Sequence, residues 1–86
     1  MNIQEEFEEA IALSKTLTKN PGNAMLQKLY GLYKQATLGD YPHEKPAGFD
    51  MIAMAKHEGW KTQQGKPAQE AMREYIEIIT QLKAQE

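Results

Sequence analysis

The chain has 86 residues, which is enough for a single domain spanning residues 1–86 and too few for a second hydrophobic core. It contains no cysteine, so neither disulfides nor cysteine-based metal sites can hold it together. Its formal net charge of −2 argues against a general nucleic-acid-binding protein, because such domains usually carry a strong basic excess.

The sequence also lacks the features that direct a chain to a membrane. Residues 1–6 include two glutamates and lack the basic segment and apolar run of a secretory signal peptide. No stretch approaches the ~18 consecutive apolar residues of a membrane-spanning helix. We therefore expect a soluble, cytoplasmic protein with no integral membrane segment.

Apolar periodicity predicts helices throughout and no strands. The first helix is expected over residues 3–17, and Pro21 and Gly22 then favour a break. The second is expected over residues 23–38, with Asn23 as its N-cap and Gly39 as its stop. Side chains at steps of three and four give each helix one face towards the core: Ile3, Phe7, Ala10, Ser14 and Leu17 in the first, and Met25, Leu29, Leu32 and Ala36 in the second.

Two further helices follow a proline-containing segment. Residues 40–48 predict a long ordered loop, and residues 49–61 a short third helix with apolar side chains at Phe49, Ile52, Ala53, Ala55 and Trp60. Pro67 suits the first position of a fourth helix that continues to residue 84. Its core face comprises Met72, Tyr75, Ile76, Ile79 and Leu82. The predicted fold class is all-α, a four-helix bundle with a long loop between helices 2 and 3.

The second helix carries another stripe beside its core face. Tyr30, Tyr33, Lys34 and Thr37 recur at helical spacing and share one side of the helix. Tyrosine rings can stack on a nucleobase, their hydroxyl groups can donate to phosphate oxygens, and lysine supplies a positive charge. Periodicity alone leaves a second interpretation open, in which the tyrosines pack against a neighbouring helix and Lys34 lies in solvent.

The run from Tyr30 to Asp40, YGLYKQATLGD, resembles the motif of the acyl-CoA-binding protein family, Tyr-x-x-Tyr-Lys-Gln-Ala-Thr-x-Gly-Asp. The resemblance extends over nearly the whole chain. Other residues at the family's spacing are Phe7, Lys15, Pro21, Glu44, Pro46, Lys56, Trp60, Ala71, Met72, Tyr75 and Ile76. It implies an up-down-down-up bundle that acts as a non-catalytic carrier of long-chain acyl-CoA esters, generally as a monomer.

The resemblance also implies a set of ligand-binding residues. Tyr30, Lys34 and Lys56 match the group around the ribose 3′-phosphate of CoA. Tyr33 and Tyr75 match the aromatic contacts to the adenine nucleotide, and Lys15 matches a further nucleotide contact. Residues 30–34 as a block are expected to line the head-group site. The full expected set is Lys15, Tyr30, Gly31, Leu32, Tyr33, Lys34, Lys56 and Tyr75.

Four positions depart from the family pattern. Asn20, Ile52 and Met54 stand where lysine is common, and His57 replaces a usual tryptophan. The loss of basic charge predicts weaker binding than is typical of the family. An alternative is that Ile52 and Met54 widen an apolar groove for the acyl chain, because methionine adapts to varied shapes. Ordinary helix packing is a third interpretation of these two residues.

No motif indicates an enzyme, a cofactor or a metal site. His43 and His57 have no partner at metal-ligand spacing, and Ser14 has no histidine near it in the sequence. An acyl-CoA hydrolase would need a nucleophile or an activated water that the sequence does not show. The alternative from another class is a helical protein-interaction module that receives a partner helix on the aromatic face of its second helix. For a carrier, the expected partners besides fatty acyl-CoA are acyl-CoA-using enzymes.

Overall fold

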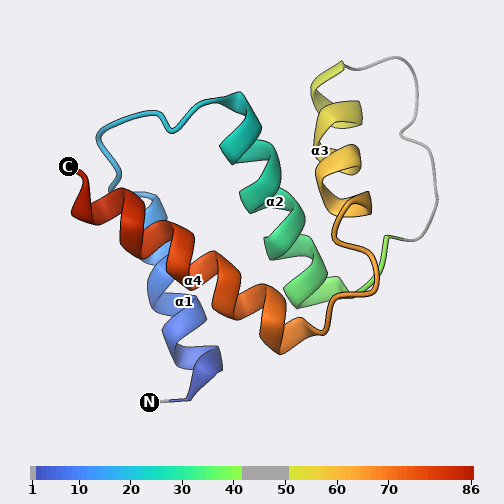
Figure 1. The fold of residues 1–86 in the computed structure, drawn as a ribbon, viewed down its shortest axis with the longest axis horizontal. Coiled ribbons are helices and arrows are strands. Elements are labelled where there is room, and N and C mark those ends of the chain that lie inside the picture. Colours follow the sequence, from blue (N-terminus) through green and yellow to red (C-terminus); the bar gives the residue numbers. More distant parts are fainter. Residues whose placement is uncertain (1, 42–50) are drawn as a thin grey trace.

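The computed structural model describes the backbone of residues 2–41 and 51–86, and the side chains of residues 2–41 and 54–86. These ranges contain four α-helices and no strand: α1 (Ile3–Ser14), α2 (Asn23–Leu38), α3 (Met51–Lys61) and α4 (Ala68–Ala84). Figure 1 shows α1 and α4 running in one direction and α2 and α3 in the opposite direction. The predicted up-down-down-up, all-α fold is therefore confirmed.

Three helix ends differ from the prediction by one to three residues. α1 ends at Ser14 rather than at residue 17, because the hydroxyl groups of Ser14 and Thr16 donate to carbonyl oxygens three residues earlier and tighten the last turn. The N-cap of α2 is Gly22, whose φ of 97° suits glycine, and Asn23 is the first helical residue. Pro67 likewise precedes α4 as its N-cap. The predicted start of the third helix at residue 49 lies outside the described residues, as do the side chains of Ile52 and Ala53.

The hydrophobic core lies where α1, α2 and α4 meet. Its largest fully buried side chains are Phe7, Leu32 and Ile79, one from each of these helices. The ring of Phe7 meets that of Tyr75 edge to face, with 5.2 Å between the centroids. The predicted core faces of α1, α2 and α4 are buried or half-buried at every position. The periodicity of these three helices therefore identified the core correctly.

The helices pack in a chain of neighbours rather than around one axis. Among the described helices, α1 packs against α4, α4 against α2, and α2 against α3. The molecule measures 37 × 27 × 16 Å along its principal axes, so it is markedly flattened. Because α3 lies at the edge and contacts α2 alone among these helices, the α2–α3 contact fixes its position (Figure 1).

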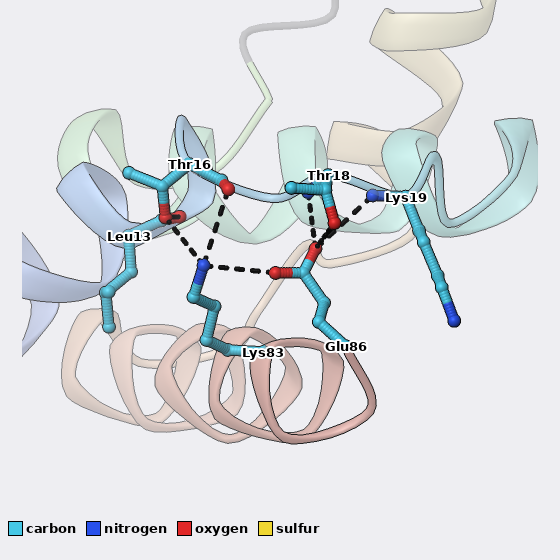
Figure 2. A network of polar contacts seen from close by, with 6 residues as sticks. All are labelled: Leu13, Thr16, Thr18, Lys19, Lys83 and Glu86. Carbon is cyan, nitrogen blue, oxygen red and sulfur yellow. Dashed lines mark hydrogen bonds and ion pairs between the residues drawn. The ribbon is translucent and has the colours of Figure 1, made fainter.

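Polar side chains secure the two ends of this arrangement. Buried Gln35 donates from Nε2 to Asp40 Oδ1 and to the Lys66 carbonyl, each at 2.8 Å, which ties the end of α2 to the turn before α4. At the other end, the Glu86 carboxylate accepts from the backbone N–H groups of Thr18 and Lys19 (Figure 2). We call the contacts of Glu86 and Lys83 with residues 16–19 the C-terminal clasp.

The clasp also changes the acidity of its carboxyl group. The backbone N–H of Thr18 and the Lys83 ammonium group, 3.0 Å from Glu86 Oε1, stabilise the carboxylate and lower the pKa of Glu86 from 4.5 to about 2. Lys83 also donates to the carbonyl and the hydroxyl oxygen of Thr16. The segment between α1 and α2 is therefore held to the C-terminal end of α4 by charge-assisted hydrogen bonds.

Candidate functional site

Two lysines from different helices converge on one tyrosine ring. Lys34 lies one turn after Tyr30 on α2, and its Nζ is 5.6 Å from the Tyr30 ring centroid. Lys56 of α3 places its Nζ 5.6 Å from the same centroid. The two amines are therefore separated by no more than twice that distance. Both lie within the range of a cation–π interaction, so the ring helps to hold the two charges in place.

Trp60 forms a second wall beside Lys34. The Lys34 Nζ is 5.9 Å from the Trp60 ring centroid. The indole Nε1 donates to the Gly39 carbonyl at 2.8 Å, and the indole ring meets that of Tyr41 edge to face at 5.4 Å. Trp60 is thus fixed at the end of α2 although it belongs to α3. Trp60 is not among the ligand-binding residues predicted from the sequence. Its position one helical turn after Lys56 is the signal that could have identified it.

A close approach of α2 and α3 brings the lysines together. A Cβ atom on Gly31 would lie 2.0 Å from the Gly59 carbonyl oxygen, and one on Gly59 would lie 2.3 Å from the Gln27 carbonyl oxygen. The Gln27 side chain also donates from Nε2 to the Ala55 carbonyl at 2.7 Å. These two helices can approach this closely only because neither glycine has a side chain.

Within the described part of the chain, no carboxylate pairs with either lysine of the site. Among residues 2–41 and 54–86, Lys34 and Lys56 form no ion pair, whereas Lys66 pairs with Glu74 at 2.7 Å. Lys34 is half-buried and Lys56 is exposed. Two neighbouring cations without a carboxylate form a locally positive surface on a chain whose net charge is −2. Such a surface suits an anionic ligand with an aromatic component.

The predicted aromatic residues Tyr33 and Tyr75 both contact Phe7. Tyr33 stacks on the Phe7 ring with 6.1 Å between the centroids and remains 37% exposed, so part of its surface is open to a ligand. Tyr75 meets Phe7 edge to face and is only 6% exposed. Its ring therefore belongs mainly to the core, and little of its surface is open to a ligand.

The remaining residues of the predicted ligand-binding set are Leu32, Gly31 and Lys15. Leu32 has no exposed surface, so its side chain supports the site from the core and has no surface with which to touch a ligand. Gly31 is buried in the α2–α3 contact. Lys15 is exposed at the C-cap of α1, and within the described part of the chain no contact links its amine to Tyr30, Lys34 or Lys56. The structure thus brings together Tyr30, Lys34 and Lys56, and the role of Lys15 stays a prediction.

The positions that depart from the family motif have distinct environments. Asn20 accepts from the Gly22 N–H at 2.8 Å, so its side chain shapes the turn before α2. Met54 is 46% exposed, so about half of its surface is open to solvent. His57 is half-buried and meets the Tyr41 ring edge to face, and its buried Nδ1 atom has no hydrogen-bond partner among the described residues. The side chain of Ile52 lies outside the described residues.

No group of three or more His, Cys, Asp or Glu side chains in the described part of the chain is arranged to hold a metal ion. None of the helices there combines the length and the apolar character needed to cross a bilayer.

Comparison with known proteins agrees with this geometry. Residues 4–79 match the family described as Acyl CoA binding protein. The chain belongs to the acyl-CoA-binding protein family. It is 45% identical over 82 residues to the acyl-CoA-binding protein of Brassica napus, a match that covers 95% of this chain and 89% of that protein. The acyl-CoA-binding domain-containing protein 6 of Arabidopsis thaliana matches with the same identity and coverage.

The fold of this family member also matches a solved structure. The crystal structure of acyl-CoA-binding protein 2 from Oryza sativa superposes with a TM-score of 0.91 at 40% identity, covering 98% of this chain and 93% of that one. The resemblance that the sequence motif indicated is therefore confirmed at the level of both sequence and fold.

Proposed function

We propose that this protein binds long-chain acyl-CoA esters and acts as a non-catalytic carrier of the acyl-CoA pool. The observation that carries the proposal is the convergence of Lys34 and Lys56 on the Tyr30 ring with no carboxylate among the described residues to neutralise them. CoA offers the complementary chemistry, because it joins an adenine ring to several phosphate groups. Its 3′-phosphate monoester carries nearly two negative charges near neutral pH.

In this proposal the head group is recognised mainly by α2 and α3. Lys34 and Lys56 neutralise the 3′-phosphate from two sides, and Tyr30 adds a hydroxyl group beside them. A charge-assisted hydrogen bond of this kind contributes about 1.5–3 kcal/mol when it is shielded from water. The exposed Lys56 should contribute less than the half-buried Lys34, because water screens exposed pairs. The partly exposed face of Tyr33 is available to stack on adenine.

The acyl chain has an apolar surface close to this site. Leu26 lies one turn before Tyr30 on α2 and is 45% exposed, and Met54 on α3 is exposed to a similar extent. The two residues belong to the two helices that carry the lysines, and the Gln27 side chain hydrogen-bonds to the Ala55 carbonyl between these helices. Each methylene group that is removed from water contributes roughly 0.8 kcal/mol. Head-group contacts should therefore select CoA esters, and burial of the acyl chain should favour longer ones.

Titration calorimetry with a series of ligands tests the proposal. Affinity should rise along a series of acyl-CoA esters of increasing chain length, and free CoA and free palmitate should both bind weakly. Bound ester should also raise the melting temperature as occupancy increases. Equal affinities for free CoA and palmitoyl-CoA would contradict the proposed contribution of the acyl chain.

The finer parts of the proposal concern what the carrier does with its ligand. We infer a monomeric, cytoplasmic protein that passes its esters intact to acyl-CoA-using enzymes. Prolonged incubation with palmitoyl-CoA should release no free CoA above the rate in buffer. Faster release of CoA by the protein would identify a hydrolase instead.

A further inference from the structure

The two glycines at the α2–α3 contact each lie one helical turn from a site lysine. Gly31 precedes Lys34 by three residues on α2, and Gly59 follows Lys56 by three residues on α3. Residues three apart lie on the same side of a helix. The close approach at the glycines therefore lies on the same side of each helix as the site lysine, one turn away. Any change in helix separation at the glycines is passed on to the lysine pair.

The space at this contact is too small for a side chain. Ordinary van der Waals contact of a Cβ atom begins at 3.4 Å, whereas added Cβ atoms at Gly31 and Gly59 would meet backbone oxygens at 2.0 Å and 2.3 Å. Backbone atoms cannot rotate aside as the end of a side chain can, so the helices would have to separate by roughly 1 Å. The Gln27 Nε2 bond to the Ala55 carbonyl holds the same pair of helices together.

We propose that Gly31, Gly59 and Gln27 are positioning residues that set the spacing of Lys34 and Lys56, and thereby the selectivity for a ligand with a phosphate monoester at that point. This inference rests on the proposed function. Both amines lie 5.6 Å from the Tyr30 centroid, and in this proposal one phosphate beside that ring contacts both at once. When α3 is displaced, a single phosphate can contact only one amine in full, so the preference for the phosphorylated ligand falls. Contacts to the rest of the ligand change much less.

The test compares two esters that differ only in this group. Binding of palmitoyl-CoA and of its 3′-dephospho form is measured by calorimetry, and the ratio of the two affinities reports the phosphate contact alone. We expect a ratio of about tenfold or more for the natural chain, in line with one or two charge-assisted hydrogen bonds. In the Gly59→Ala variant this affinity ratio should fall to about three or less, while the affinity for the dephospho ester stays nearly unchanged.

Two controls separate positioning from a general loss of structure. Ala68→Ser adds one atom at an exposed position of α4, outside the α2–α3 contact, and should leave the ratio unchanged. In a Lys56→Gln background, adding Gly59→Ala should have little further effect on the ratio, because the second amine is already missing. A merely structural role of Gly59 would weaken both esters equally and leave the ratio as it was.

Each result bears on the inference. If the natural chain prefers the phosphorylated ester and folded Gly59→Ala keeps the full preference, the inference fails and the proposed function stands. If the natural chain binds neither ester, both fail. Should Gly59→Ala not fold, Gln27→Ala decides the matter, because it adds no bulk: a reduced ratio supports the inference, and an unchanged ratio overturns it.

Discussion

Replacing Lys34 with glutamine removes the cation that lies closest to both aromatic walls of the site. Its amine is 5.6 Å from the Tyr30 centroid and 5.9 Å from the Trp60 centroid, so this charge is held in place by two rings. A charge-assisted hydrogen bond to phosphate is worth about 1.5–3 kcal/mol, which corresponds to a loss of about tenfold to a hundredfold in affinity for acyl-CoA. Lys56→Gln should cost less, because Lys56 is exposed and more strongly screened.

Lys28→Gln provides the matched control for this experiment. Lys28 is an exposed lysine of the same helix, and within the described residues it has no contact with Tyr30 or Trp60. The three variants carry the same change of charge, so calorimetric titration with palmitoyl-CoA should rank them Lys34→Gln, Lys56→Gln and Lys28→Gln in decreasing loss of affinity. Equal effects for Lys34→Gln and Lys28→Gln would show that only the overall charge matters. That result would refute the phosphate contact.

Three predictions concern stability. The pKa of Glu86 is lowered in the folded state, so its stabilising contribution is complete above pH 4.5 and is lost as the pH falls towards about 2. The Glu86→Gln variant should therefore have a lower melting temperature than the natural chain at pH 7 but not near pH 2. A difference in melting temperature that stays constant with pH would contradict the C-terminal clasp. Phe7→Ala should lower the free energy of unfolding by about 3–5 kcal/mol, measured by urea denaturation. A loss below about 1 kcal/mol would show that neighbouring core side chains move in and fill the cavity. Gln35→Leu should cost about 1–3 kcal/mol in the same assay, because it removes both hydrogen bonds from Nε2. No loss would mean that burial of Oε1, which has no hydrogen-bond partner among the described residues, already offsets the contribution of these bonds.

The fold could be predicted from the sequence to a large extent, because three of the helices have one clearly apolar face. Phe7, Leu32 and Ile79 are each placed on the core side by spacing alone, and all three are fully buried. The helix ends were less predictable. Gly22, rather than Asn23, caps α2 because its backbone adopts a positive φ that the residue pattern does not reveal. The side-chain turn at Ser14 and Thr16 ended α1 early for a similarly local reason.

The site could be predicted in part. The stripe of Tyr30, Tyr33 and Lys34 follows from helical spacing, whereas the partial exposure of Tyr33 is known only from the structure. The arrival of Lys56 at the Tyr30 ring depends on how α3 docks against α2, which periodicity within one helix cannot give; the family motif supplied it. The same motif placed Leu32 and Gly31 among the ligand-binding residues, although their side of α2 faces the core and α3. Spacing along a helix shows which residues are neighbours, but the packing of a second helix decides which of them stay exposed.

A structure determined with bound palmitoyl-CoA would show whether Lys34 and Lys56 hold the head group. We expect a ligand phosphate within about 4 Å of both the Lys34 and the Lys56 amines, the distance of a direct ion pair, with the Tyr30 ring beside it. A complex in which the head group lies elsewhere and both amines remain in solvent would contradict it.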